Sequence, residues 1–249
     1  MNNFYNITSD RIYFEERKIR KDFLKGAKQG IPIALGYIPV AFTFGLMAVN
    51  GGIPILMAIL ISLTNLTSAG QFLGASLIIA DASLFEITFA TFVINIRYML
   101  MSLSLSQKIP ANMSLPKRSI MAFGITDEIF AVASLEEKEI TFPYMMGLTA
   151  CPYFGWALGT ALGAMISSVL PMSLQSSMGI ALYAMFIALI VPSAKKSKPA
   201  LIVIITAVLI STIFKLLPCM KLLSEGWSII ITTIIAATLG ALLFARKDE

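Results

Sequence analysis

The chain has 249 residues, of which 57% are hydrophobic and 13% are charged, and its formal net charge is +5. The charged share is about half of that in soluble domains, and the mean hydropathy of +0.82 is too apolar for a single soluble core of this size. These values exclude a disordered, collagen-like or disulfide-rich protein and indicate one that spans a membrane several times. The absence of histidine from the sequence excludes His-based catalytic triads and His-ligated metal sites.

Residues 1–25 form a basic segment that we expect to lie in the cytoplasm. Basic residues beside a first membrane span mark the inner side of the membrane. Those before position 30 are Arg11, Arg17, Lys18, Arg20, Lys21, Lys25 and Lys28. Nucleic-acid binding is the alternative for a basic arm, but Glu15, Glu16 and Asp22 interrupt this run, so we expect no nucleic-acid partner.

Eight apolar segments come near the length of about 20 residues that a helix needs to cross a bilayer. They lie at 29–50, 53–80, 85–107, 118–135, 140–169, 175–192, 199–217 and 226–245. This pattern predicts an all-α integral membrane protein with about eight membrane segments.

The directions of these segments can be interpreted in two ways. With eight plain crossings and an internal N-terminus, the loop 108–118 falls outside although it carries three basic residues, against the positive-inside rule. If 53–80 and 140–169 each enter and leave on one side, this loop moves inside. The sequence leaves both arrangements open.

Two pairs of short motifs favour an internal repeat. The stretch 36–42 matches 124–130 in its Gly and Phe positions, and 70–74 matches 155–159 in its glycines, at offsets of 88 and 85 residues. Three segments followed by three more place the second unit upside down, as in many secondary transporters. We therefore predict repeat 1 over 26–110, an inverted repeat 2 over 117–192 and two further helices over 198–245.

The strongest chemical signal is the run Thr126-Asp127-Glu128 inside an apolar segment. An ionised carboxylate at membrane depth is costly unless it is paired. Adjacent helix positions point about 100° apart, so a continuous helix cannot turn both acids toward one partner, whereas a broken helix could. Such acids could carry a coupling proton or attract a substrate ammonium. The alternative is a shallower segment with both acids among lipid headgroups.

A second signal is Asn95-Ile96-Arg97-Tyr98, which lies far from either end of its segment. Arg97 could pair with Asp127 or Glu128, or it could hold a substrate carboxylate in a bidentate manner. Structural pairing alone is the alternative.

The first apolar segment carries Gly36 and Pro39. Proline removes a helix hydrogen bond, so this pair predicts a break whose free N–H groups would bind an anion. A simple kink is the alternative. We expect substrate contacts from Gly36, Tyr37, Pro39 and Phe42, facing Thr126 and Phe130 in the second repeat.

Small and polar side chains cluster from Thr64 to Gln71. Gln71 could contact a substrate, or the cluster could join two helices. The glycines at 159 and 163 are four residues apart, and this spacing favours close helix packing.

At these residues the chain resembles the AzlC family of branched-chain amino acid permeases, over roughly 20–245. The resemblance rests on the proline-containing first span, Ser68-Ala69-Gly70-Gln71, Asn95-x-Arg97, Thr126-Asp127-Glu128 and Trp156-x-x-Gly159-Thr160. It implies export of branched-chain amino acids, sometimes methionine, across a bacterial plasma membrane. It also implies a separate small AzlD-like membrane subunit and coupling to an ion gradient, and the sequence has no phosphate-binding loop.

Two positions depart from the family pattern. Tyr98 stands where the family often has His, and Gly179-Ile180-Ala181 stands where it often has Asp-Phe-Ala. A mechanism that uses that His or that Asp does not transfer to this chain.

We therefore expect a secondary transporter of small hydrophobic amino acids, with Asp127 and Glu128 in ion coupling and no enzymatic activity. No cofactor or metal is expected, because Cys151 and Cys219 support neither a disulfide framework nor a zinc site. The alternatives are an assembly subunit or channel whose site a partner completes, and an intramembrane enzyme using the two acids.

Overall fold

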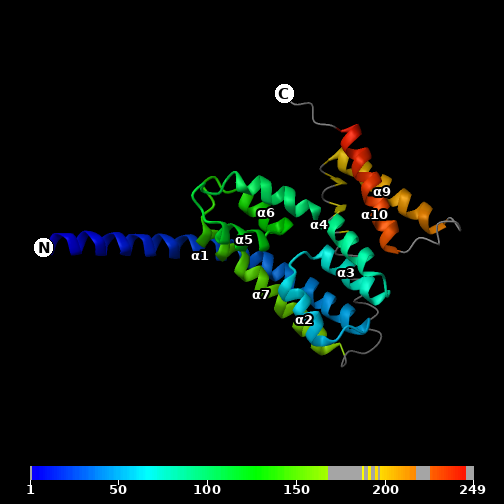
Figure 1. Cartoon of the computed structure of the whole chain (residues 1–249), viewed down its shortest axis with the longest axis horizontal. Helices are drawn as coiled ribbons and strands as arrows, with labels where there is room; N and C mark the ends of the chain where they lie inside the picture. Colours follow the sequence, from blue (N-terminus) through cyan, green and yellow to red (C-terminus); the bar gives the residue numbers. More distant parts are fainter. Residues whose placement is uncertain are drawn as a thin grey trace.

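The computed structural model describes residues 2–167, 187, 190–191, 194–195, 197–216 and 225–244, with side chains from Glu16 onward except at 225. Every element in these ranges is a helix, which confirms the all-α class (Figure 1). Among them α1 (Asn2–Asn50), α4 (Leu84–Ser106), α9 (Lys198–Leu216) and α10 (Glu225–Leu243) are long and apolar enough to cross a membrane. The predicted segment 175–192 lies largely outside the described residues, as does Cys219, so the count of eight is not confirmed.

The long helices α1 and α7 (Phe142–Ile166) pack side by side and run in the same direction. Gly147 lies on the backbone of Phe23, and Gly163 lies on that of Phe42, so the residue numbers rise together along both helices. Glycines allow the two backbones to approach closely, as the spacing of 159 and 163 predicted. This seam fixes the axis of the bundle.

The helices α2 (Ile55–Thr64) and α3 (Ala69–Ile79) form a hairpin that starts and ends beside the C-terminal end of α1. Ile53 donates its N–H to the carbonyl of Ala48 before α2 begins, and the side chain of Ile79 packs on Gly51 where α3 ends. The hydroxyl of Tyr153, in the middle of α7, donates to the carbonyl of Leu63 near the hairpin tip at 2.9 Å. The hairpin therefore enters the bundle to about half its depth and returns.

The helices α5 (Leu115–Phe123) and α6 (Asp127–Ser134) form a second hairpin, which enters from the other end of the bundle. Where α6 ends, the ammonium of Lys108 donates to the carbonyl of Ser134 at 2.6 Å, and the N–H of Ile140 donates to the carbonyl of Lys108 at 2.8 Å. Lys25 of α1 forms an ion pair with Glu136 at this same end. We call it the basic end, because Lys108, Lys117, Arg118 and Lys138 lie in or next to its loops 107–114 and 135–141.

These contacts decide which segments return. The region 53–80 enters and leaves on one side, as the second interpretation had it. The region 140–169, in contrast, contains α7, a single long helix that runs parallel to α1. The region 118–135, read from sequence as a crossing, belongs to the second hairpin. Each hairpin arm has 8 to 11 residues, or about 12–17 Å of helix, which is too short to cross a hydrocarbon core of about 30 Å.

The described part of the chain contains two units that run in opposite directions, and each is shorter than the predicted repeats. A long helix followed by a hairpin occurs twice, as α1 with α2–α3 and as α4 with α5–α6. Residues Gly70 and Gly74 of α3 face Asn95 and Thr91 of α4 respectively, so α4 runs opposite to α3 and α1. The 3+3 repeat over 26–110 and 117–192 stays a prediction, because its last segment falls largely outside the described residues.

Of the two C-terminal helices, α10 packs on α4 and α9 packs on α10, at some distance from the α1–α7 seam (Figure 1). The ring of Trp227 lies 6.2 Å from that of Phe85 and 6.1 Å from that of Phe89. A carboxylate oxygen of Glu86 accepts from the N–H of Gly226 at 3.1 Å. An acceptor at the start of α10 satisfies a helix N–H that has no partner within the helix.

Candidate functional site

The tips of the two hairpins meet at a cavity of about 270 Å³ near the middle of α1 and α7. Ser68 reaches it from the α2–α3 tip, and Glu128 reaches it from the α5–α6 tip. The remaining walls come from α1 and α7. They are formed by Pro32, Ile33, Gly36, Tyr37, Val40 and Trp156.

The break between α5 and α6 places the two adjacent acids. The chain leaves α5 at Gly124, and Thr126 is extended and accepts the N–H of Ile129 on its hydroxyl, so it caps α6. Asp127 and Glu128 then occupy the first turn of α6, where the helix dipole stabilises negative charge. The broken helix expected from the adjacent acids is therefore present.

The two carboxylates have different partners. Asp127 forms an ion pair with Arg97 of α4, with 2.8 Å between Nη1 and Oδ2. Glu128 accepts a hydrogen bond of 2.5 Å from the hydroxyl of Tyr37 on α1. The same hydroxyl lies 2.7 Å from Oγ1 of Thr126. The α5–α6 tip is thus tied to α4 by one acid and to α1 by the other.

Arg97 and Tyr98 also join the two hairpin tips. A guanidinium nitrogen of Arg97 donates to the hydroxyl of Tyr98 at 3.2 Å, and this hydroxyl donates to the carbonyl of Thr67 at 3.0 Å. Thr67 belongs to the α2–α3 tip, whereas Asp127, the ion-pair partner of Arg97, belongs to the α5–α6 tip. Tyr98, the departure from the family pattern, therefore lies at the junction of both tips.

The predicted break at Gly36 and Pro39 is wrong, because α1 is continuous through Pro32 and Pro39. Each proline removes one backbone hydrogen bond, but the long seam with α7 supports the helix on both sides of it. The carbonyl of Pro39 accepts a hydrogen bond from Thr43. Consequently α1 offers no free N–H group here. Gly36 leaves open space at the cavity wall, since no described atom lies within 4 Å of the place that its Cβ would take.

Gln71 is buried in a polar network between helices. Its Nε2 donates to Oγ of Ser62 at 2.6 Å, and its Oε1 accepts from the indole N–H of Trp156 at 2.9 Å. Ser62 and Thr160 share a hydrogen bond of 2.7 Å. Both ends of the Gln71 amide are therefore occupied, and the structure supports the helix-joining alternative.

Three other predicted site residues do not line the cavity. Asn95 packs against Gly70, and its Oδ1 is buried without a hydrogen-bond partner among the described residues. Phe42 contributes its backbone to the seam with Gly163, and Phe130 packs in the core cluster around Ile129. The apolar wall is built instead by Ile33, Val40 and Trp156.

Sequence reasoning missed five residues that line the cavity: Pro32, Ile33, Val40, Ser68 and Trp156. A helical pattern could have found three of them, because Pro32, Ile33 and Val40 each lie about one turn from Gly36 on one face of α1. Ser68 could not be found in this way. It has a positive φ of 48° at the hairpin tip, a conformation that residues other than glycine rarely adopt.

Comparisons with known proteins match this part of the chain. The model of the AzlC protein family matches residues 32–170, a range that includes every residue lining the cavity. An uncharacterized membrane protein of Archaeoglobus fulgidus is 35% identical over 175 residues, which cover 70% of this chain and 76% of that protein. Inner membrane protein YgaZ of Escherichia coli is 29% identical over 71% of this chain and 75% of its own length. An uncharacterized membrane protein of Helicobacter pylori is 26% identical over 92% of this chain and 99% of its own length. No solved structure matches the chain.

Proposed function

Because this chain belongs to the AzlC protein family and is a multi-pass membrane protein, we propose that it is a subunit of a secondary transporter. It exports branched-chain or other hydrophobic amino acids and is not an enzyme. The observation that carries the proposal is the cavity between two hairpin tips that enter from opposite ends of the bundle. Discontinuous helices that meet at the middle of a membrane are the usual binding sites of such transporters.

The walls of the cavity suit the parts of a small hydrophobic amino acid. Glu128 offers a carboxylate to the substrate ammonium, and Ile33, Val40 and Trp156 surround an aliphatic side chain. Its 270 Å³ exceeds the roughly 150 Å³ of an apolar cavity that holds benzene. A leucine-sized molecule therefore fits without displacing the helices.

The substrate carboxylate binds at the start of α3. Ser68, which lines the cavity, precedes α3, and this helix has neither a side-chain cap nor an acidic residue in its first turn. Free N–H groups at a helix start attract anions. The first turn of α6 instead carries Asp127 and Glu128, so the two hairpin tips attract opposite charges.

Asp127 and Glu128 couple transport to an ion gradient. Each is held by a partner from a long helix, namely Arg97 and Tyr37. A substrate ammonium or a coupling cation that binds Glu128 competes with Tyr37 and frees the α5–α6 tip. Exchange of these partners links occupancy of the site to movement of the hairpin.

The basic end faces the cytoplasm of a bacterial cell, and the protein lies in the plasma membrane. The loops 107–114 and 135–141 lie at this end together with the basic residues of α1, whereas the loops 51–54 and 80–83 at the other end carry no Lys or Arg. This division follows the positive-inside rule, which the eight-crossing interpretation breaks at the loop 108–118. A small AzlD-like membrane subunit completes the transporter, as the family resemblance implies.

Leucine efflux from cells that express the chain with its small partner tests this function. Asp127→Asn and Glu128→Gln each lower the initial efflux rate about tenfold or more, because each variant removes a charge-assisted contact. Glu137→Gln, which changes an exposed acid in the loop after α6, leaves the rate unchanged. Normal leucine efflux by both site variants would contradict the mechanism. A parallel screen of uptake and efflux with all twenty amino acids identifies the substrate and the direction of transport.

A further inference from the structure

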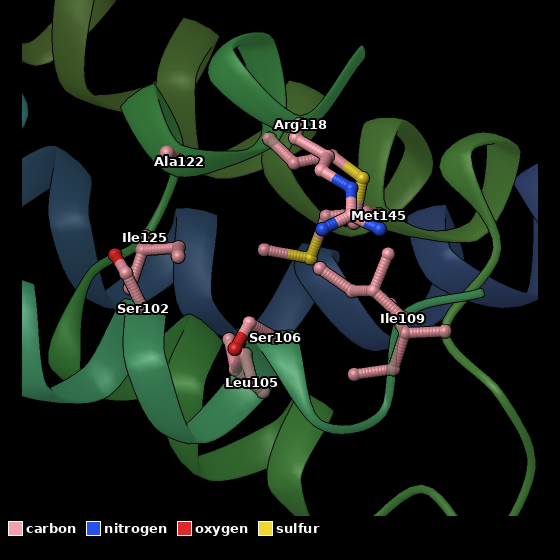
Figure 2. A pocket seen from close by; sticks show the side chains of 10 residues that line it. Ser102, Leu105, Ser106, Ile109, Arg118, Ala122, Ile125 and Met145 are labelled. Atoms are coloured by element: carbon pink, nitrogen blue, oxygen red, sulfur yellow. The ribbon is translucent and has the colours of Figure 1, made fainter. Parts of the chain in front are cut away.

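A second, smaller cavity lies between the α5–α6 hairpin and the basic end of the bundle (Figure 2). Its volume is about 160 Å³, and it is bounded by the C-terminal half of α4, by α5 and by the start of α7. Met121, Ile125, Ile140 and Met145 form its apolar wall. None of the residues that line the first cavity lines this one.

The second cavity lies between the first cavity and the basic end. Ile125 belongs to its wall and immediately precedes Thr126, which contacts Tyr37 at the first cavity. Ile109, from the loop at the basic end, belongs to the opposite part of the wall. A molecule that passes from the first cavity to the basic end along α4 therefore meets this cavity once the α5–α6 tip moves.

Arg118 gives the second cavity a fixed positive group. Its Nε donates to the carbonyl of Met113 at 3.0 Å, and its Nη2 donates to the carbonyls of Pro110 and Ala111 at 3.2 and 3.0 Å. These bonds hold the guanidinium against the cavity wall, and none of the three uses the N–H groups of Nη1. A guanidinium held in this way is preorganised to bind a carboxylate.

Hydroxyl groups lie across the cavity from this arginine. Figure 2 shows the oxygens of Ser102 and Ser106 on one side and the guanidinium of Arg118 on the other, with the apolar side chains between them. Hydroxyl oxygens can accept hydrogen bonds from an ammonium group. The cavity thus combines an anion-binding group, hydrogen-bond acceptors and an apolar interior.

We propose that this cavity is a second binding site for the same hydrophobic amino acids, occupied on the cytoplasmic side of the α5–α6 hairpin. The proposal rests on the proposed function, since it places the site on the route of the transported substrate. Its 160 Å³ is close to the roughly 150 Å³ that encloses benzene, which suits a four-carbon side chain and is far too small for a lipid acyl chain. Arg118 takes the substrate carboxylate.

The number of leucine molecules that bind at saturation, counted per chain in the complex purified with its small partner, tests this proposal. We expect two radiolabelled leucines per wild-type chain and one per chain of Ser102→Phe, because the new ring fills the cavity from α4. Ser104→Phe places the same ring on an exposed position of the same helix and retains two. Arg118→Gln weakens one of the two sites about tenfold and leaves the affinity of the other unchanged.

The outcomes separate this proposal from the function on which it rests. One leucine per chain in the wild type, or an unchanged number in Ser102→Phe, overturns the second site and leaves the first intact. No leucine bound by any of these chains overturns both the proposed function and the second site. Ser102→Phe does not touch the bonds that Arg118 makes to its loop, so its result holds even if Arg118→Gln fails to fold.

Discussion

Replacement of Tyr37 by phenylalanine is expected to loosen the α5–α6 hairpin while it leaves the ring packing intact. Tyr37 is only 7% exposed, and its ring contacts that of Trp156 edge to face at 5.3 Å. Phenylalanine keeps this contact and removes only the hydroxyl, which holds Glu128 at 2.5 Å and lies 2.7 Å from Thr126.

The size of the effect follows from the charge of the partner. A hydrogen bond to a charged group contributes about 1.5–3 kcal/mol, so we take a loss of about 2 kcal/mol for the bond to Glu128. If the bond breaks when the hairpin opens, its removal raises the population of the open state roughly thirty-fold, since 1.4 kcal/mol corresponds to tenfold. Thr126 adds little, because its hydroxyl still accepts the N–H of Ile129.

A buried cysteine on the inner face of the α5–α6 hairpin reports this opening. Met121 of α5 is 2% exposed, so Met121→Cys, in a chain whose Cys151 and Cys219 are replaced by serine, reacts with a water-soluble maleimide only when the hairpin moves. Tyr37→Phe should raise the labelling rate by roughly the thirty-fold given by the same bond energy.

The matched control is Tyr153→Phe, which removes the 2.9 Å hydrogen bond from α7 to Leu63 in the other hairpin. It should leave the labelling rate of Met121→Cys near its original value. An unchanged rate in Tyr37→Phe, or an equal increase in both variants, would refute the argument that Tyr37 holds this hairpin.

Two further predictions concern the framework of the bundle. Gly163→Ala places a Cβ far closer than 3.0 Å to the carbonyl oxygen of Phe42, so thermal unfolding in detergent should show a loss of at least about 2 kcal/mol. Gly36→Ala meets no described atom within 4 Å, so its unfolding midpoint should not fall, and an equal loss in both variants would argue against the seam. The ion pair of Lys25 and Glu136 has side chains 48% and 12% exposed, so a double-mutant cycle with Lys25→Gln and Glu136→Gln should give a coupling energy below about 1 kcal/mol. A coupling well above that value would mean that this pair closes the basic end more firmly than its exposure suggests.

Composition alone was enough to predict the class of this protein, because a soluble core of this size could not bury so many apolar residues. The hairpins could not be predicted in the same way. The region 53–80 carries enough apolar residues for one crossing, and its turn at 65–68 contains no proline or glycine. Asn65 supports the turn locally, since its Oδ1 accepts from the N–H and the hydroxyl of Thr67. The network of Gln71, Ser62 and Trp156 then holds the two arms in place, and the sequence around the turn does not reveal this network.

The distribution of basic residues did carry information about topology. The loop 108–118 conflicted with eight plain crossings, and that conflict correctly indicated that some segments return. It could not identify which segments do so, because 118–135 and 140–169 are both apolar and either could be re-entrant. The contact between Lys108 and Ser134 decides between them, and it joins residues 26 positions apart in sequence.

At the site, the sequence predicted which charged residues take part better than it predicted which residue each of them contacts. Arg97 was expected to pair with Asp127 or Glu128, and the α5–α6 break gives it Asp127 while Glu128 turns to Tyr37. The expectation for Pro39 failed, because local helix propensity was overridden by packing against α7. The uncapped helix start that we propose as the anion site is that of α3, and its position depends on the fold of the whole hairpin.

The α1–α7 seam sets the order in which the chain can assemble during synthesis. Tyr144 of α7 donates a hydrogen bond to Gln29 of α1 across 115 residues of sequence. At the usual 5–20 residues per second, α1 waits roughly 6–23 s before its main partner leaves the ribosome. During that time α7 is not yet packed on the glycine-bearing face and the two prolines of α1. The ribosome therefore completes α2–α3, α4 and α5–α6 while α1 still lacks its partner, and the two hairpins gain their shared wall only when α7 is inserted.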